Sequence, residues 1–283
     1  NNYMATCENI NRLLALNGDY FLVIVDNNSI NESVKYLRSK YDNVDGIIIV
    51  ESKNNGGYSA GNNLGAKTAI RQNSNLKFIA IMNPDVIIKN KEIFGKMLDK
   101  ATEYKNVAVV APRMIENGVL QGKRSGWMLA GIWERILSRT PFQNMFHSEI
   151  KAASEGSYQY IDAVHGSFFI IKKNIFEKIK FLDSNIFLYG EETALGIKVK
   201  KAGYAECIDN DYTYVHNHDY SSETADQMIK QGKITYNSMK YIIEQYYNPS
   251  WYHLFLFLLV QGSLYYIYFP TLLKFKRFVK RIK

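Results

Sequence analysis

The sequence predicts an α/β fold with a mostly parallel sheet flanked by helices. Three short runs of apolar residues are typical of strands buried on both faces, and they cover 21–25, 46–50 and 78–82. Segments with apolar residues at helical spacing separate these runs, and a polar loop follows each of them. Strands that alternate with helices in this way indicate a doubly wound sheet, in which ligands bind at the carboxyl ends of the strands.

Each element is predicted from its local pattern. Residues 6–17 form the first helix, because apolar side chains recur there at helical spacing and Asn17-Gly18 ends the pattern. Helices are also predicted at 32–40, 63–72, 90–104, 191–202 and 222–247, and further strands at 107–111, 164–171 and 212–216. Residues 113–160 have no clear period, which predicts loops and short helices that cover a site.

Composition limits the classes of protein that fit. A chain of 283 residues that is 47% hydrophobic and 22% charged can bury a core, which excludes a disordered protein. Two cysteines, Cys7 and Cys207, exclude a disulfide scaffold and indicate a reducing compartment. The net charge is +8, but six positive charges lie in the last ten residues, which leaves +2 for residues 1–273. Because the body is near neutral, we expect no nucleic-acid partner.

The C-terminal part has its own character. Residues 251–269 are almost all apolar or aromatic, and their number is close to the roughly 20 that a transmembrane helix needs. Tyr265, Tyr266 and Tyr268 suit a membrane interface, and the basic tail favours anionic lipid. We expect a helix or helical hairpin that lies in the interface; a membrane span, a core helix and an oligomer contact are the alternatives. The expected division is an α/β domain at 1–225 and this helical segment at 226–283.

Polar residues follow each of the first three predicted strands. Asp26 follows the first strand, an Asn/Gly-rich loop at 54–63 follows the second, and Asp85 comes after the third behind Pro84. Because the carboxyl ends of parallel strands share one edge of a sheet, we expect these residues at one site. Glycines let backbone N–H groups approach a phosphate, and a helix N-terminus favours anions. Ordinary turns and helix caps explain the same residues without a ligand.

Five motifs in order resemble those of the inverting glycosyltransferases of family 2, which have the GT-A fold, and among them the bacterial rhamnosyltransferase-like members. The motifs are Val25–Ser29, Asn55–Gly65, Met82–Val86, Gly166–Ile171 with Phe187–Glu192, and His216. The resemblance covers roughly 1–225, and the family's first strand is expected before the start of this chain. Three positions depart from the family pattern: Asn83 and Asn31 stand where the family usually has Asp, and so does Glu192.

The resemblance implies a role for each motif residue. The implied donor-binding residues are Asp26, Asn28, Asn55, Gly56, Gly57, Asn62, Asn63, Asn83 and Asp85. Asp85 and His216 are the implied ligands of Mg²⁺ or Mn²⁺, hard cations that prefer oxygen ligands and would neutralise a leaving diphosphate. Asn62 and Asn63 also suit the cap of the helix that we expect after them.

Glu191 and Glu192 are the candidate catalytic carboxylates. Two adjacent carboxylates at a helix start cannot both point at one atom, and the family motif matches Glu192 to the general base and Glu191 to its neighbour. A base takes the proton of an acceptor hydroxyl as its oxygen attacks the anomeric carbon opposite the diphosphate. A single displacement of this kind inverts the anomeric centre. Stabilisation of the helix dipole is the alternative role for both residues.

Together these observations predict an inverting hexosyltransferase associated with the cytoplasmic face of a bacterial cell membrane. We expect it to move a sugar, rhamnose by the resemblance, from a dTDP- or UDP-linked donor. The expected acceptor is a lipid-linked saccharide used in surface polysaccharide synthesis, and an anionic membrane surface is an expected partner. The sequence is compatible with an oligomer. The alternatives are a non-catalytic sugar- or lipid-binding scaffold on a transferase fold and another nucleotide-using transferase, such as a nucleotidyltransferase.

Overall fold

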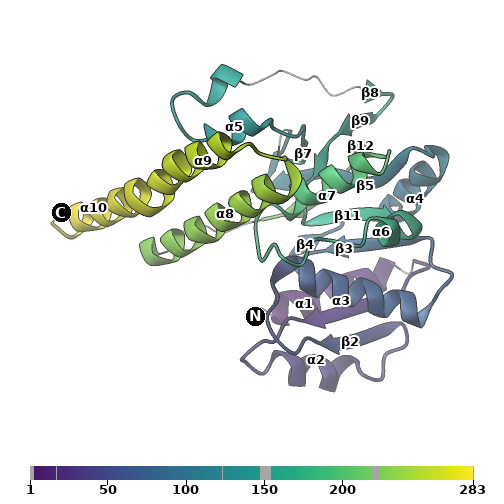
Figure 1. Ribbon diagram of the computed structural model, residues 1–283. Helices are drawn as coiled ribbons and strands as arrows, with labels where there is room; N and C mark the ends of the chain where they lie inside the picture. Colours follow the sequence, from purple (N-terminus) through teal and green to yellow (C-terminus); the bar gives the residue numbers. More distant parts are fainter. Residues whose placement is uncertain (1–2, 17, 123, 147–153, 218–223, 283) are drawn as a thin grey trace. The chain divides into compact units, whose positions relative to one another are not determined.

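The computed structural model describes residues 3–16, 18–122, 124–146, 154–217 and 224–282. The chain forms two compact units (Figure 1), which we call the sheet unit and the helical unit. The sheet unit comprises 1–128, 152–185 and 191–218, and the helical unit comprises 129–151, 186–190 and 219–283. Both units are therefore discontinuous in sequence. A domain boundary between 225 and 226 stays a prediction.

The sheet unit contains the elements that the sequence predicted, with additional short strands. Its helices are α1 (Tyr3–Leu16), α2 (Ser33–Tyr41), α3 (Gly57–Gln72), α4 (Ile93–Glu103), α6 (Lys173–Lys178) and α7 (Glu191–Lys201). Its strands are β1 (Leu22–Asp26), β2 (Ile47–Glu51), β3 (Phe78–Met82), β4 (Val86–Ile87), β5 (Val107–Glu116), β6 (Val119–Leu120), β7 (Gly126–Trp127), β8 (Ser154–Glu155), β9 (Tyr158–Ile161), β10 (Ala163–Val164), β11 (Phe168–Lys172) and β12 (Ala205–His216).

The sheet is mixed, which refines the expectation of a mostly parallel one. Strands β1 and β2 pair in parallel, as do β5 and β12. In the large sheet, with the order β3-β11-β5-β12-β9-β8, strand β11 runs antiparallel to both of its neighbours. A buried strand reads as an unbroken apolar run in either direction, so the run at 168–171 gave no sign of its orientation.

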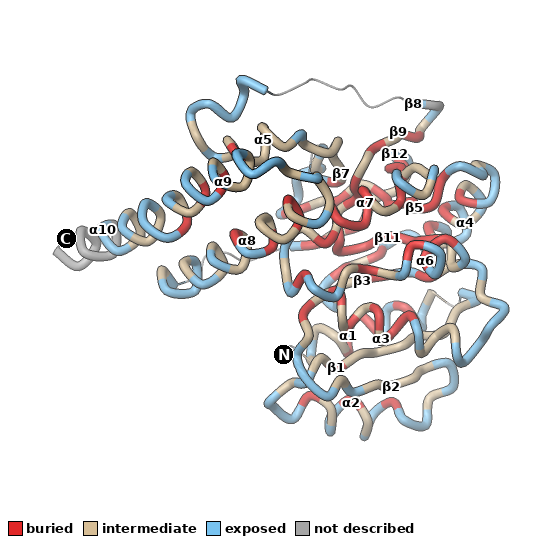
Figure 2. Tube along the Cα trace, in the orientation of Figure 1, coloured by how far each residue is buried: buried red, intermediate tan, exposed pale blue. Residues whose placement is uncertain are grey.

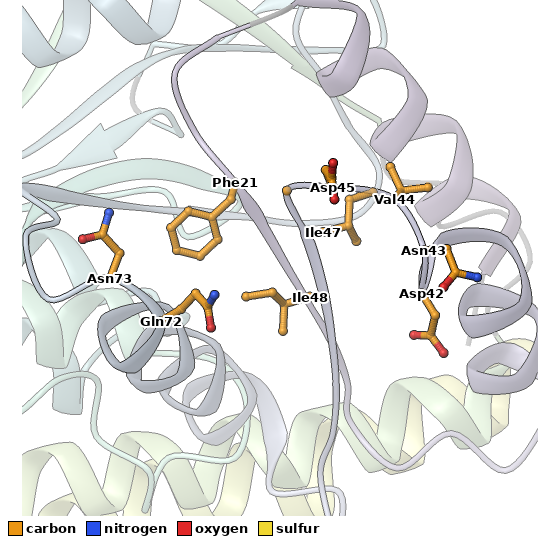
Figure 3. Close-up of a pocket in the computed structure, with 10 residues that line it drawn as sticks. Phe21, Asp42, Asn43, Val44, Asp45, Ile47, Ile48, Gln72 and Asn73 are labelled. Atoms are coloured by element: carbon orange, nitrogen blue, oxygen red, sulfur yellow. The ribbon is translucent and has the colours of Figure 1, made fainter.

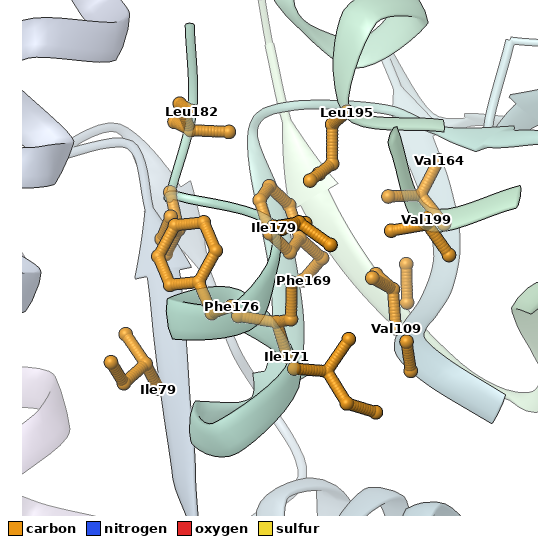
Figure 4. Packing of buried hydrophobic residues seen from close by; sticks show 14 of the residues in the cluster. Ile79, Val109, Val164, Phe169, Ile171, Phe176, Ile179, Leu182, Leu195 and Val199 are labelled. Carbon is orange, nitrogen blue, oxygen red and sulfur yellow. The ribbon is translucent and has the colours of Figure 1, made fainter. Parts of the chain in front are cut away.

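Helices cover both faces of this sheet, and the alternation along β11 shows it directly. Phe169 and Ile171 pack with the core that includes α6 and α7, where Leu195 and Val199 of α7 lie opposite them (Figure 4). Phe168 and Ile170, by contrast, pack with the core that includes α4. Figure 2 shows the resulting band of buried residues along the central strands. Burial on both faces explains why the strands read as apolar runs instead of alternating patterns.

Several elements differ from their predicted bounds. Strand β5 continues beyond the predicted 107–111, and the strand predicted at 164–171 is divided into β10 and β11 by a turn at 165–167. Helix α3 begins at Gly57 and not after Asn63, because the Asn55 side chain accepts a hydrogen bond from the Gly57 N–H at 3.1 Å and starts the helix there. The capping role expected for Asn62 and Asn63 was therefore wrong, since both residues lie inside the helix. Strand β12 is longer than the predicted 212–216, because its first half holds buried acidic residues that hide the strand pattern.

The helical unit holds the C-terminal apolar helix that the sequence predicted. Its elements are α5 (Ile132–Ile136), the 3₁₀ turn η1 (Gln143–Phe146), α8 (Ala225–Tyr246), α9 (Trp251–Ser263), the π-helical turn η2 (Leu264–Tyr268) and α10 (Phe269–Ile282). Thr224 and Gln227 form a capping box at the start of α8. The first two residues of the predicted helix at 222–247 lie outside the described residues. The core of the helical unit is built from Ile136, Tyr236, Ile243, Phe257 and Tyr265.

Helix α7 packs so closely against the β10 region that one of its positions requires glycine. A Cβ atom on Gly196 would lie 1.9 Å from the carbonyl oxygen of Asp162. We expect Gly196→Ala to lower the free energy of unfolding by about 1–3 kcal/mol or more, because the backbone must move apart. Gly95 of α4 has no atom within 4 Å of the same position, so Gly95→Ala should raise stability by about 0.5–1 kcal/mol. Urea unfolding checks both variants, and equal stabilities would contradict this account.

Candidate active site

The turn at His165–Ser167, between β10 and β11, is the centre of the candidate site. The carbonyl of Ser167 accepts a hydrogen bond from the Asn83 N–H at 2.8 Å, just after β3. The carbonyl of Gly166 accepts one from the Tyr58 hydroxyl of α3. The Gly166 N–H donates to the Glu192 carboxylate of α7 at 3.3 Å. Backbone groups of one turn therefore bind three elements that are distant in sequence.

Side chains of the same turn contact β12. The Ser167 hydroxyl lies 2.7 Å from the Tyr214 hydroxyl and 2.8 Å from Nδ1 of His165. The rings of His165 and His216 have centroids 5.7 Å apart. Glu192 is thus bound by the backbone of this turn, and His216 lies beside the His165 ring. The predicted base and the predicted metal-binding histidine therefore lie next to the same turn.

Asp85 and His216 meet because β4 pairs antiparallel with the end of β12, where Val86 lies opposite His216. Oδ1 of Asp85 lies 3.3 Å from Nε2 of His216. Ligands at neighbouring positions of an octahedral cation, each at about 2.1 Å, are about 3 Å apart, so this spacing fits a shared Mg²⁺ or Mn²⁺. Within the described ranges, no three His, Cys, Asp or Glu side chains gather around one metal position. A cation here would need further oxygen ligands, as a diphosphate provides.

Glu191 and Glu192, at the start of α7, have different environments. The Glu191 side chain is buried, and burial together with the neighbouring Glu192 charge raises the pKa of Glu191 to about 8. Glu192 is only half-buried. Burial and the two glutamates also raise the pKa of Tyr58 well above its usual value, so this hydroxyl keeps its proton and remains a donor. Glu191 therefore keeps its proton near neutral pH.

The loops after β1 and β2 are joined at the N-terminus of α3. The Asn27 side chain donates to the Asn55 side chain at 3.2 Å and to the Gly57 carbonyl at 2.9 Å. Asp26 is buried and accepts a hydrogen bond from the Ser29 N–H at 2.7 Å. Asn28 adopts a left-handed conformation, with φ of 61°. Asn27, which was not predicted as a donor residue, therefore joins the loop of Asp26 and Asn28 to the predicted donor residues at 55–57, where the first N–H groups of α3 lie.

The remaining predicted donor residues have different surroundings. Asn63 is buried, and its amide bonds both the N–H and the carbonyl of Leu182 and the hydroxyl of Ser184, at 2.9–3.0 Å. Asn62 donates to the Tyr58 carbonyl one turn earlier. These contacts are structural, and a donor role for either residue stays a prediction. Asn83 is fixed through its backbone beside the 165–167 turn and close to Asp85 in the chain.

One hollow of the sheet unit lies away from these residues. A space of about 730 Å³ opens at the amino-terminal ends of β1 and β2, where Phe21, Ile48 and Gln72 line it (Figure 3). It contains none of the predicted site residues. Ligands of α/β sheets bind at the carboxyl ends of the strands, so we assign no function to this hollow.

Two residues near the site were missed in the sequence. Tyr58 stands in the Asn/Gly-rich segment but was given no role, because nothing there indicated that α3 begins before it. Glu206 is buried on β12 and accepts a hydrogen bond from the Val164 N–H at 2.8 Å, and burial raises its pKa strongly. Gly166 could have indicated the turn near which both residues lie, because a glycine inside an apolar run is typical of a break in a strand.

Comparisons with known proteins place the chain in a family. Residues 3–180 match the model of glycosyl transferase family 2. The chain belongs to this family. A curated relative is the low-salt glycan biosynthesis hexosyltransferase Agl10 of Haloferax volcanii, which is 27% identical over 195 residues. The match covers 68% of this chain and 57% of that protein, so the chain spans little more than half the length of this relative.

Several solved structures share the fold. GalNAc-T7 with UDP, GalNAc and Mn²⁺ has a TM-score of 0.58 at 13% identity, covering 79% of this chain and 41% of that one. The mannosyltransferase PcManGT of Pyrobaculum calidifontis, in complex with GDP-Man and Mn²⁺, has 0.56 at 14% identity, covering 94% and 66%. TarS of S. aureus, residues 1–349, has 0.52 at 13% identity, covering 90% and 68%. The family member described here therefore has a GT-A-like fold, as predicted.

The raised pKa of Glu191 has a consequence for stability. Between about pH 4.5 and 8 the folded chain holds a proton that the unfolded chain has lost, so the free energy of unfolding falls as the pH rises. The slope from this group reaches about 1.4 kcal/mol per pH unit and ends above the folded pKa. Glu191→Gln removes this slope, so its melting temperature should fall less between pH 5 and 8. Glu177→Gln, on the surface of α6, should keep the wild-type profile; parallel profiles for all three proteins would contradict the assignment.

Proposed function

We propose that this chain is an inverting glycosyltransferase that moves a hexose from a nucleotide-diphosphate donor to an acceptor hydroxyl in glycan biosynthesis. One observation carries the proposal: Glu192 and the Asp85–His216 pair both lie beside the 165–167 turn. Glycosyl transfer requires a base for the acceptor and a group that neutralises the leaving diphosphate. The turn has a candidate for each next to it, and family membership supports the same reaction.

In this proposal Glu192 is the general base. Its Oε1 accepts the Gly166 N–H, which orients the carboxylate. Glu191 keeps its proton near neutral pH because it is buried beside a second carboxyl group, so Glu191 is the less suitable base of the two. Glu192 would take the proton of the acceptor hydroxyl as its oxygen attacks the anomeric carbon from the face opposite the diphosphate. The product is inverted, and no covalent intermediate forms on the protein.

The donor is proposed to bind along the loops after the first three strands. The N–H groups at the start of α3 suit the diphosphate, and the side chains of Asp26, Asn28 and Asn55 suit the nucleoside. Asp85 and His216 would hold Mg²⁺ or Mn²⁺. A bound cation supplies charge neutralisation for the leaving diphosphate. In support, two structural neighbours were solved with Mn²⁺, one with UDP and one with GDP-Man.

The partners of the reaction are the less constrained part of the proposal. The resemblance to rhamnosyltransferase-like members supports a dTDP- or UDP-linked sugar, rhamnose among them. We further propose a lipid-linked saccharide acceptor at the cytoplasmic face of a bacterial membrane. The apolar helix at Trp251–Phe275, which is long enough to cross a membrane by length and composition, supports the membrane location. The name of the Haloferax volcanii relative supports a role in glycan biosynthesis.

Replacing the proposed base separates catalysis from binding. We expect Glu192→Gln to lower kcat by about 10²- to 10⁴-fold, because the amide cannot accept the acceptor's proton. The affinity for the nucleoside diphosphate should stay the same, as measured by calorimetry. Glu177→Gln is the matched control and should transfer sugar at the wild-type rate. Wild-type turnover in Glu192→Gln would refute the assignment of the base, and binding without turnover in the wild type would favour the non-catalytic scaffold.

The proposed cation pair is tested by thermal shift with dTDP, UDP and GDP, each with and without Mn²⁺. A nucleotide that binds the folded protein raises its melting temperature by mass action. We expect a shift that requires Mn²⁺ in the wild type and is lost in Asp85→Asn and His216→Ala. Asp99→Asn, on the exposed surface of α4, should keep the shift. A shift with no need for Mn²⁺, or one that both site variants retain, would overturn the proposed cation site.

A further inference from the structure

The C-terminal helix exposes a continuous apolar face. Trp251 and Ile267 are the most exposed members, at 78% and 65%. We define the apolar face as Trp251, Phe255, Leu258, Leu259 and Ile267, all exposed. Their spacing of three, four or eight residues places them along one side of a helix. Soluble monomers rarely leave so many large apolar side chains together in water, so this face is expected to have a partner.

The opposite side of the same helix packs against the core of the helical unit. Phe257, Gln261 and Tyr265 recur every four residues and are all buried. The Gln261 amide donates to the carbonyls of Ile136 and Ser138, at 2.8 and 2.9 Å. These bonds satisfy carbonyl groups at the end of α5 and fix the rotation of α9 about its own axis. The apolar face is therefore directed away from the core of the unit.

Charged residues of α8 lie beside the middle of this helix. The Tyr236 ring stacks on Phe257 with centroids 5.4 Å apart. The Lys233 ammonium lies 5.6 Å from the centre of the Tyr266 ring. One turn beyond Tyr236, Lys240 and Glu244 form an ion pair at 3.3 Å. Helix α8 thus accompanies the apolar helix over much of its length, as the ribbon also shows (Figure 1).

This packing decides between crossing a bilayer and lying on it. If Trp251–Phe275 spanned the membrane, α8 would bring Lys233 and the Lys240–Glu244 pair to the depth of the lipid tails, where charged side chains are costly. If the helix lies in the plane of the interface, the apolar face enters the lipid and α8 stays on the water side. The second arrangement leaves every contact of the helical unit in place.

The charge of the segment identifies the lipid. Residues 251–283 contain no Asp or Glu, and their last ten residues contain six Lys or Arg. Basic residues next to an inserted apolar helix are attracted to the negative surface of anionic membranes. We propose that the helical unit binds an anionic lipid surface, with α9, η2 and α10 lying in the plane of the interface and the apolar face in the lipid. This inference extends the membrane part of the proposed function and is independent of the transfer reaction.

Vesicle flotation of the full chain tests the surface. We expect binding to vesicles of phosphatidylcholine with phosphatidylglycerol, weaker binding to phosphatidylcholine alone, and weaker binding at high salt. Phe255→Glu with Leu259→Glu should lower the affinity for vesicles at least about tenfold, because two exposed apolar side chains that would enter the lipid are lost. Val119→Glu with Leu120→Glu changes two exposed apolar residues of β6 and should bind like the wild type. Equal binding by both double variants would overturn the proposal.

Depth measurements test the orientation. Both native cysteines are buried, so a single new surface cysteine can take a spin label. We expect labels at Trp251→Cys, Leu259→Cys and Ile267→Cys to report similar shallow depths in anionic vesicles. A label at 259 near the bilayer midplane, with 251 at the surface, would indicate a crossing helix and overturn the proposal. A concentration-dependent dimer that buries the same labels without vesicles would assign the face to a second copy instead. Nucleotide binding in the same samples reports separately on the transferase proposal.

Discussion

The backbone of the 165–167 turn is the constraint on which the candidate site depends. One carbonyl takes the hydroxyl of Tyr58, the next takes the amide of Asn83, and one N–H binds Glu192. A Cβ atom on Gly166 would lie 2.8 Å from the Glu192 carboxylate, so the turn tolerates this arrangement only with glycine there. Because backbone groups of the turn make these contacts, the strand ends and α7 are held together by main-chain geometry at this point.

Burial gives the acidic residues of the sheet unit different tasks. Glu206 is fully enclosed and binds the Val164 N–H, and burial favours its neutral form. Glu191 is also buried and takes up a proton, whereas its neighbour Glu192 lies nearer to solvent. Two carboxyl groups that stand next to each other in the sequence therefore have different surroundings, and burial favours the neutral form of Glu191.

Much of the fold could be read from the chain, because strands buried on both faces leave unbroken apolar runs. The run at 78–82 matches β3 residue for residue, and Asp26, Asn55 and Asp85 lie at the predicted strand ends. The direction of β11 could not be predicted, because an apolar run looks the same in a parallel and in an antiparallel strand. The start of α3 was placed too late, because glycines that usually mark a loop here let the helix approach β1, where a Cβ on Gly65 would lie 2.9 Å from Val25. The meeting of Asp85 and His216 depends on β4, a strand of two residues that is too short for any periodicity.

The helical unit is assembled from three separate stretches of chain, and this limits how it can be exchanged. Helix α9 binds the first stretch through Gln261, whose amide donates to the Ile136 carbonyl. Helix α8 binds the short stretch 186–190, because the Ser238 hydroxyl donates to the Leu188 carbonyl at 2.7 Å. A single crossover before α8 would therefore join foreign helices to two native stretches that no longer match them. The helical unit could therefore not be acquired simply by fusing a new segment to the end of the gene. A working chimera would need to transplant all three stretches together.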